Sequence, residues 1–333
     1  MIQYRSYKNL ALPYSASHIP NNFSVAYKDG NSFEFSVIHK YGVITGNQEV
    51  IADCLKKPWP TSSSVPTGAL ALSLVIFQSK TFLFDQKPVL IVLTSRGPFI
   101  SLSGDLEAFP GFALEELAAN AEWSMHICVT VLADNLICIG NCQGLVHVLQ
   151  LENYSREGLT LFQTVHTSPQ SRALLLTADK ALLAAADSAG KLWTWYLDVK
   201  TMVPILKSVP TGVSTLLNAM ELTEVFVILG YANGLLRLMC RDTGSVYADI
   251  NAHGAAITAM AYSWKAQVLM TVGEDSFIQM WAIDEKSDDC KVQHLQQQVA
   301  EDMLLCGVQF LNADGSRFGV VGYDRNEILV FKN

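Results

Sequence analysis

Short apolar runs alternate with tight polar turns along most of this chain. In the clearest copy, the apolar run 268–272 is followed by the polar turn 273–276 and by a second apolar run, 278–281. Runs of this length that are rich in β-branched residues and bounded by Gly, Asp and Ser predict two strands joined in a hairpin. Similar copies occur before and after this one, so the pattern predicts a protein built from repeated β-hairpins.

The hairpins recur at a nearly constant interval. The first apolar residues of the second strands are Phe99, Val146, Leu192, Leu236, Ile278 and Ile328. Successive positions are 47, 46, 44, 42 and 50 residues apart. A period of roughly 40–45 residues with a hairpin in each copy is typical of β-propeller blades. The helices that would separate the strands of a doubly wound α/β fold are missing from the pattern, so an all-β propeller is expected.

The first 85 residues carry a further blade that matches the repeat less well. Its strands are expected at residues 23–27, 33–39 and 42–45, with Ile44 near the anchor position. Together with the six regular copies it makes seven blades, and an eighth would need about 40 more residues. We therefore expect residues 1–333 to form a single seven-bladed β-propeller domain.

Two stretches between the repeats have the composition of loops. Residues 57–68 hold three prolines and four consecutive Ser or Thr residues, with little to bury. Residues 104–122 separate two hairpins, and their segment 113–120 favours a short helical turn. We expect both stretches to be loop insertions.

The edge of the last blade must be covered. The final repeat ends with a strand that is third in its blade, and an unpaired sheet edge invites pairing with other chains. We expect the N-terminal strand, around residues 2–10, to complete this blade.

The copy at residues 251–283 carries polar residues at four characteristic positions. The four are His253, Thr271, Asp275 and Trp281. The carboxylate of a turn Asp can accept a hydrogen bond from a His on the preceding loop, which can extend the network to a strand hydroxyl and a Trp indole N–H. These residues resemble the hallmark of WD40 repeats, with Ala252 where the family has Gly and Ala282 replacing the Asp after the Trp. We therefore predict a structural tetrad of hydrogen-bonded side chains.

The other copies keep fewer of these residues. His166 and Trp195 fit the fourth blade, but Ala189 stands at its Asp position. In the fifth blade Asn233 can replace the Asp, and Met239 stands in place of the Trp. The fold prediction therefore depends on the period more than on the motif.

The whole chain, and most of all its final third, resembles the WD repeat-containing protein 54 family. The stretches 250–253, 273–275, 305–307 and 322–324 carry the resemblance, and 21–25 adds a weaker match. The resemblance implies a propeller scaffold and brings no catalytic residue with it.

The charge and the cysteine content indicate which partners, compartment and cofactors to expect. With 31 acidic and 23 basic residues the net charge is −8, and no Lys/Arg cluster reverses it, which argues against nucleic acid. The seven cysteines are odd in number and lie mostly in apolar runs, as reduced thiols in a cytoplasmic protein do. Cys138 and Cys142 have no second Cys/His pair at a zinc-ligand spacing, so neither a metal nor another cofactor is expected.

No apolar stretch long enough for a membrane helix and no secretory leader are found in the sequence. We expect a soluble cytoplasmic protein without membrane insertion, and an association with cilia or the cytoskeleton stays open.

Motifs of catalysis are missing too. There is no Gly-x-Ser-x-Gly elbow, no phosphate-binding loop and no dinucleotide fingerprint. His253 with Asp275 resembles a catalytic His–Asp pair, but their spacing fits the repeat tetrad and no nucleophile accompanies them. An enzyme with a site in the central channel would need carboxylates or His on the inner strands, where mainly Val, Ile, Leu, Ala and Thr are expected. We therefore predict that the protein is not an enzyme.

The turns between second and third strands converge on one face of a propeller and offer residues for binding. The candidate partner-binding residues are Tyr231, Tyr323, Arg325, Arg96 and Asn233. Tyr and Arg are enriched at interface hot spots, although these can equally be ordinary exposed turn residues. The prediction is a non-catalytic scaffold or adaptor for other proteins. The alternative is a structural subunit of a large assembly, such as a ciliary or microtubule-associated complex, and self-association also stays open.

Overall fold

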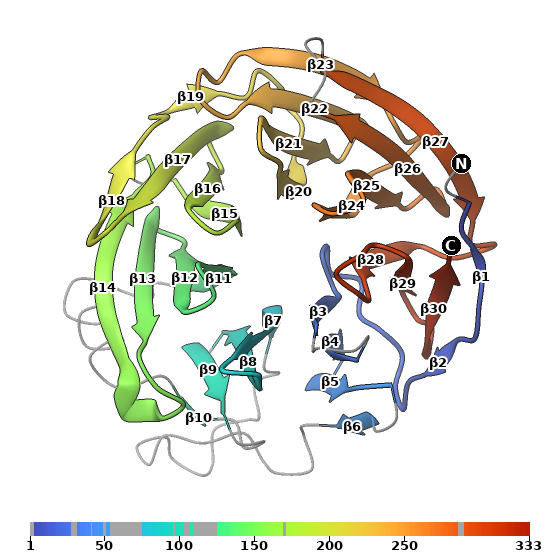
Figure 1. The fold of residues 1–333 in the computed structure, drawn as a ribbon, viewed down its shortest axis with the longest axis horizontal. Coiled ribbons are helices and arrows are strands. Elements are labelled where there is room, and N and C mark those ends of the chain that lie inside the picture. Colours follow the sequence, from blue (N-terminus) through green and yellow to red (C-terminus); the bar gives the residue numbers. More distant parts are fainter. Residues whose placement is uncertain are drawn as a thin grey trace.

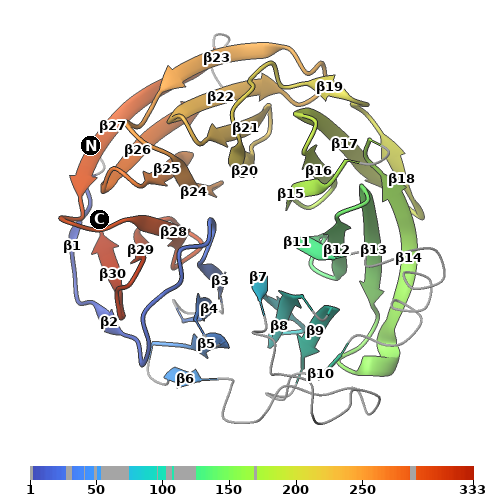
Figure 2. The same ribbon diagram turned by 180° about the vertical axis from the view of Figure 1, so that it is seen from behind.

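Seven antiparallel sheets stand around a central axis as the blades of a propeller (Figure 1). The computed structural model describes residues 3–27, 32–40, 42–48, 51–53, 75–95, 97–102, 107–108, 125–168, 171–285 and 290–333. The chain runs once around the ring, so each blade lies beside the next one in sequence, as the view from behind also shows (Figure 2). The predicted seven-bladed all-β fold is confirmed.

The first four blades are numbered in chain order. Blade 1 contains β3 (Ser24–Tyr27), β4 (Phe33–His39), β5 (Gly42–Gly46) and β6 (Ile51–Asp53). Blade 2 contains β7 (Ile76–Phe84), β8 (Lys87–Thr94), β9 (Gly97–Ser101) and β10 (Glu107–Ala108). Blade 3 contains β11 (His126–Leu132), β12 (Leu136–Asn141), β13 (Leu145–Leu151) and β14 (Leu159–His166). Blade 4 contains β15 (Ala173–Ala178), β16 (Leu182–Asp187), β17 (Lys191–Asp198) and β18 (Thr201–Pro204), and β19 (Val209–Pro210) also pairs with β17.

The remaining blades follow the same order from the inside outward. Blade 5 contains β20 (Leu217–Leu222), β21 (Phe226–Tyr231), β22 (Leu235–Cys240) and β23 (Val246–Asn251). Blade 6 contains β24 (Ile257–Ser263), β25 (Val268–Gly273), β26 (Phe277–Asp284) and β27 (Lys291–Val299). Blade 7 contains β28 (Leu305–Phe310), β29 (Arg317–Gly322) and β30 (Glu327–Lys332), with β1 (Arg5–Ser6) and β2 (Leu10–Ala11) paired to β30.

The predicted loop insertions lie almost entirely outside the described residues. Residues 57–68 are not described, and of residues 104–122 only the short strand β10 is.

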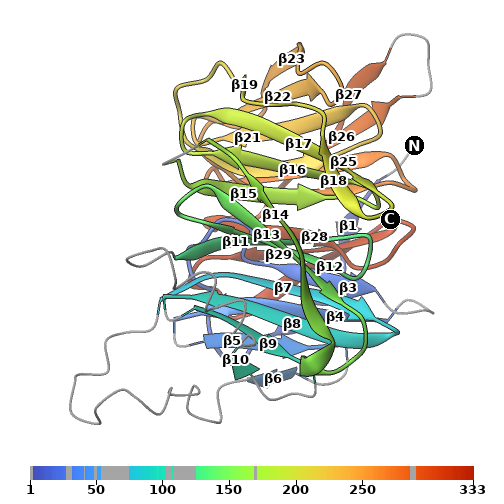
Figure 3. The ribbon, with the colours of Figure 1, turned by 90° about the vertical axis from the view of Figure 1, so that its left-hand side faces the viewer.

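One face of the ring gathers the turns between second and third strands. Each blade begins with its innermost strand and its strands alternate in direction, so these turns share a face with the connections between blades. Backbone hydrogen bonds join the two, as from Ser188 N to the Arg172 carbonyl (2.9 Å) and from Glu274 N to the Ala256 carbonyl (3.0 Å). We call this side the turn face. Seen from the side, the strands of each blade run between the two faces (Figure 3).

Apolar clusters fill the spaces between neighbouring blades and form the core. All six residues of β21 are buried because the strand is covered on both sides. Val227 and Leu229 pack toward blade 4, whereas Phe226 and Ile228 pack toward blade 6. A strand buried on both faces reads as a continuous apolar run, which explains why the sequence shows few alternating patterns.

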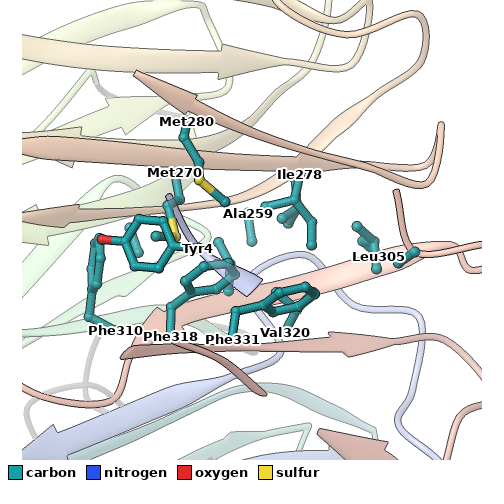
Figure 4. Packing of buried hydrophobic residues seen from close by; sticks show 14 of the residues in the cluster. Tyr4, Ala259, Met270, Ile278, Met280, Leu305, Phe310, Phe318, Val320 and Phe331 are labelled. Atoms are coloured by element: carbon teal, nitrogen blue, oxygen red, sulfur yellow. The ribbon is translucent and has the colours of Figure 1, made fainter. Parts of the chain in front are cut away.

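The N-terminal segment closes the ring at blade 7. Arg5 pairs with Lys332, and Leu10 pairs with Ile328, so this segment forms the outermost strand of the blade. Tyr4 is 1% exposed and packs edge-on against Phe318, with ring centroids 5.1 Å apart (Figure 4). The predicted closure by residues near 2–10 is confirmed.

Two glutamine side chains of β27 also hold the N-terminal segment. The backbone N–H of Tyr4 donates to Gln296 Oε1 (3.0 Å), and Gln296 Nε2 and Gln298 Nε2 both donate to the Tyr4 carbonyl (3.0 Å each). The amide groups thus act on Tyr4 as a neighbouring strand would, which ties blade 6 to the segment that completes blade 7.

Within the described residues the helical content is one short 3-10 turn, Arg156–Gly158. None of the described helices has the length and apolar character needed to cross a membrane.

Candidate functional site

The four predicted tetrad residues of blade 6 lie in one hydrogen-bonded chain. Trp281 Nε1 donates to Thr271 Oγ1 (3.3 Å), and Thr271 Oγ1 lies 2.8 Å from His253 Nε2. His253 Nδ1 lies 3.0 Å from Asp275 Oδ1. One direction satisfies every group: indole to hydroxyl, hydroxyl to Nε2, and Nδ1–H to carboxylate. The network joins the loop before β24 to two strands and the turn between them.

Asp275 also holds the turn in which it lies. Its carboxylate accepts hydrogen bonds from the backbone N–H of Gly254 (2.8 Å) and of Phe277 (3.2 Å). Burial would raise the pKa of Asp275, but the hydrogen bond from His253, together with these two amides, outweighs burial and lowers it. All contacts of the carboxylate lie within the blade, so the geometry is that of a structural clamp.

A glycine of blade 5 places the loop that carries His253. Gly234 has a φ of +81°, and a Cβ there would lie 2.0 Å from the His253 carbonyl oxygen. The Gly234 carbonyl accepts hydrogen bonds from the backbone N–H of Ala252 (3.0 Å) and of His253 (3.1 Å). This close approach of two backbones requires glycine.

Blade 4 uses a different arrangement from the one its sequence suggested. Asp187, the last residue of β16, accepts a hydrogen bond from Trp193 Nε1 (3.0 Å) and from the turn amides of Ala189 (2.9 Å) and Lys191 (3.1 Å). The acid therefore stands two residues before the expected position at Ala189 and binds Trp193 rather than Trp195. An Asp at a strand end, followed by a turn ending in Gly, was the available signal.

Tyr231 was predicted as an exposed turn residue, and this prediction is wrong. It is the last residue of β21, is 1% exposed, and packs in the cluster between blades 4 and 5. The strand extends into the expected turn, because Tyr231 still pairs with Leu217 of the inner strand. The turn itself therefore begins at Ala232.

Tyr323 and Arg325 are exposed on the turn between β29 and β30. Tyr323 is 47% exposed, and Arg325 Nη2 donates to the Asp302 carbonyl (3.0 Å). His18 lies beside them, with its ring centroid 5.4 Å from that of Tyr323 and its Nε2 3.1 Å from Glu274 Oε1. We call Tyr323, Arg325, His18 and Glu274 the turn-face cluster.

The cluster is held in place by an N-terminal loop that crosses the turn face. Ala16 N donates to the Arg325 carbonyl (2.9 Å), and Asp324 N donates to the Ala16 carbonyl (3.1 Å). Ser17 N donates to the Ile38 carbonyl of blade 1 (2.9 Å). The sequence carried no signal for His18, because its position depends on a loop that returns to blade 7 from the other end of the chain.

The other two predicted binding residues contribute less. Asn233 is exposed, and its side-chain oxygen accepts a hydrogen bond from Leu235 N (3.3 Å) within its own turn. Arg96 lies outside the described residues.

The central channel carries charges that sequence patterns did not indicate. A cavity of about 60 Å³ is lined by Lys80 of β7 and Glu221 of β20, from blades 2 and 5. Burial raises the pKa of Glu221 to about 7, although the Lys80 charge opposes the shift, and burial lowers the pKa of Lys80. The expectation of mainly apolar inner positions is therefore wrong at these two residues. A cavity of this size holds a few water molecules and is far smaller than the roughly 300–1,000 Å³ of small-molecule sites.

No group of three metal-ligating side chains comes together in the part of the chain that the structure describes. Cys138 is buried in β12, and Cys142 lies in the turn that follows it.

Seven blades closed by the N-terminal strand, with a His–Thr–Asp–Trp network in blade 6, define a WD40-type β-propeller. The WDR54 family model matches residues 4–333, and the chain belongs to this family. It is 25% identical to WD repeat-containing protein 54 of Mus musculus over 98% of this chain and 99% of that protein. The identity to WD repeat-containing protein 54 of Homo sapiens is 23%, over 99% of each chain.

Solved structures share the fold at low sequence identity. A chain from the crystal structure of the mitotic checkpoint complex matches with a TM-score of 0.70 and 13% identity, covering 100% of this chain and 96% of that chain. The computationally designed Ika8 protein matches with a TM-score of 0.60 and 13% identity, over 97% of this chain and 98% of that chain. At this identity the likeness supports the fold alone.

Proposed function

We propose that this protein is a non-catalytic scaffold that binds partner proteins through the turn-face cluster. WD40 propellers generally bind other proteins, and the family is generally non-catalytic. The observation that carries the proposal is the meeting of Tyr323, Arg325, His18 and Glu274, from three separate segments, at one exposed place. Exposed Tyr and Arg side chains held by a rigid backbone are typical of interface hot spots.

The test compares wild-type protein with a Tyr323→Ala/Arg325→Ala double variant in affinity purification with quantitative mass spectrometry. A Trp264→Ala variant is the matched control, because Trp264 is 45% exposed in the turn between β24 and β25, on the opposite face. We expect one or a few captured proteins to be lost with the double variant alone, at an unchanged melting temperature. An unchanged set of captured proteins would refute the site. An abundant partner captured at one-to-one stoichiometry would instead favour the structural-subunit alternative.

A cytoplasmic location belongs to the same proposal. All the cysteines that the structure describes carry free thiols, which supports a reducing compartment. Fluorescence microscopy of the tagged full chain tests this, and a signal in a secretory compartment would contradict it.

A further inference from the structure

Two half-buried cysteines lie on the face opposite the turn face, where blades 5 and 6 meet. Cys240 is the last residue of β22, and Cys290 directly precedes β27. The end of a third strand and the start of a fourth strand both lie away from the turns between second and third strands. The two thiols are therefore separate from the turn-face cluster.

The alternation of side chains along β22 directs Cys240 toward blade 6. Leu236 and Leu238 of the same strand pack in the apolar cluster between blades 5 and 6, and Cys240 follows them at the same two-residue period. Phe226, which pairs with Cys240 on the neighbouring strand, belongs to that cluster too. Cys290 packs against the cluster from the side of blade 6. Both thiols therefore face the same interface between blades.

A tyrosine of β23 connects the two positions. The Tyr247 hydroxyl donates a hydrogen bond to the Cys290 carbonyl. The ring centroid of Tyr247 lies 4.8 Å from that of Phe226, the residue that pairs with Cys240. The two thiols also affect each other. Burial raises the pKa of Cys290, the carboxylates at the end of β26 add to the rise, and a negative charge on Cys240 raises it further.

The turn after β22 favours the thiolate form of Cys240. Backbone hydrogen bonds fix this turn, from Cys240 N to the Ser245 carbonyl and from Gly244 N to the Cys240 carbonyl (2.8 Å each). Burial raises the pKa of the Cys240 thiol, but hydrogen bonds from the Thr243 hydroxyl and from the amides of Thr243 and Asp242 outweigh burial and lower it. A thiolate that solvent can reach is the form of cysteine that peroxides oxidise.

Other cysteines of the described residues lack this combination. Cys128, Cys138 and Cys306 are buried, and burial raises the pKa of each thiol. They therefore stay protonated and out of reach of an oxidant. Cys142 is half-buried, but it lies in blade 3, in the turn that follows β12.

We propose that Cys240 and Cys290 form a peroxide-sensitive site, in which oxidation joins blades 5 and 6 through a reversible disulfide. The Cys240 thiolate attacks one oxygen of hydrogen peroxide, the O–O bond breaks, and the departing hydroxide takes up a proton and becomes water. Cys240 is then a sulfenic acid. The Cys290 sulfur attacks the Cys240 sulfur, the S–S bond forms, and the S–O bond breaks. The hydroxide that leaves takes the Cys290 proton and becomes the second water.

The reaction is balanced by the peroxide alone. Two thiols and one hydrogen peroxide give one disulfide and two water molecules, and the two electrons that the sulfur atoms lose reduce the two peroxide oxygens. A dithiol such as dithiothreitol restores both thiols by exchange.

The test exposes the full chain to hydrogen peroxide, alkylates the remaining thiols, and identifies disulfide-linked peptides by mass spectrometry without reduction. Cys240→Ser and Cys290→Ser each remove one partner. Cys142→Ser is the matched control, because Cys142 is also half-buried. Dimedone, which reacts with sulfenic acids, is added in a parallel reaction.

We expect peptides joined through Cys240 and Cys290 from wild type and from Cys142→Ser, and their loss from the other two variants. Dithiothreitol should remove them. Cys290→Ser should retain the sulfenic acid, so that dimedone labelling of Cys240 rises about tenfold over wild type. Cys240→Ser should give no such rise at Cys290.

Wild-type protein also offers a measurement that needs no variant. At pH 7, iodoacetamide should alkylate Cys240 about fivefold or more faster than Cys142. Oxidised protein without this disulfide, or with Cys240 joined to other cysteines as often as to Cys290, would overturn the proposal. Equal dimedone labelling of Cys142 and Cys240 in the Cys290→Ser variant would overturn it too.

Discussion

Among single residues of blade 6, Thr271 combines complete burial with two hydrogen-bond partners for its hydroxyl. Its hydroxyl accepts the Trp281 indole N–H and lies against His253 Nε2, and Thr271 itself is 0% exposed. Within the described residues, Trp281 Nε1 and His253 Nε2 have no hydrogen-bond partner other than this hydroxyl. A small β-branched side chain thus joins three segments of the blade.

Replacing Thr271 with Val keeps the shape of the side chain and removes its oxygen. We expect a loss of about 1–3 kcal/mol in the free energy of unfolding, because a buried indole N–H and a buried imidazole nitrogen lose their partner. Urea denaturation measures this loss. Thr160→Val, at an exposed position of β14, is the control, and there a change below about 0.5 kcal/mol is expected. Equal stability of the two variants would show that the tetrad contributes nothing.

Within blade 3, β11 and β13 bring together the buried His126 and the half-buried His147. The ring centroids of His126 and His147 are 6.2 Å apart, and neither ring nitrogen of His126 has a hydrogen-bond partner in the described structure. Burial, with a smaller contribution from the charge of His147, lowers the pKa of His126 to about 4. Burial likewise lowers the pKa of His147 to about 4, with a smaller contribution from His166.

These shifts make the blade sensitive to acid. Since the folded pKa of His126 lies below the ordinary 6.5, the unfolded chain binds more protons, and the stabilisation present above pH 6.5 is lost as pH falls toward 4. Between pH 7 and pH 4.5 we expect the free energy of unfolding to fall by about 2–3 kcal/mol because of His126. His126→Leu should remove this part of the pH dependence, and His166→Leu, at an exposed position, should keep most of it. Urea denaturation at several pH values decides, and identical pH profiles for His126→Leu and wild type would contradict the argument.

At the scale of the whole molecule, one short N-terminal segment decides whether the ring is closed. It pairs with β30, inserts Tyr4 into the cluster between blades 6 and 7, and is held by Gln296 and Gln298 of β27. Without it, β30 would present an open edge, and the core around Phe318 would lose an aromatic neighbour (Figure 4).

Deleting residues 1–12 should lower the melting temperature by about 5–10 °C, mainly because the buried aromatic ring of Tyr4 is lost. Gln296→Ala should cost about 1–2 kcal/mol in the full chain and nothing more in the shortened chain, because its partner there is gone. Gln293→Ala, at an exposed position of the same strand, is the control. Calorimetry and urea denaturation measure both effects. An unchanged melting temperature after the deletion would show that the N-terminal segment does not stabilise the ring.

Much of the architecture could be predicted from the sequence because it depends on short-range order. Strand periods, turn residues and the recurrence of hairpins are local, and they indicated seven blades and the second and third strands of the regular repeats. His253, Thr271 and Asp275 could be found because they lie in one repeat at fixed spacing. The closure by residues near 2–10 followed from counting strands in the last blade.

Contacts between distant segments were decided only by the tertiary structure. Tyr231 is buried because blade 4 covers it, and Lys80 meets Glu221 because the ring brings blades 2 and 5 to one channel. His18 reaches Glu274 because an N-terminal loop returns across the turn face. The neighbours of a residue in the sequence determine which strand it belongs to and which face of that strand it occupies. The burial of its side chain and its contact partners depend on how the closed ring places blades that lie far apart in the sequence.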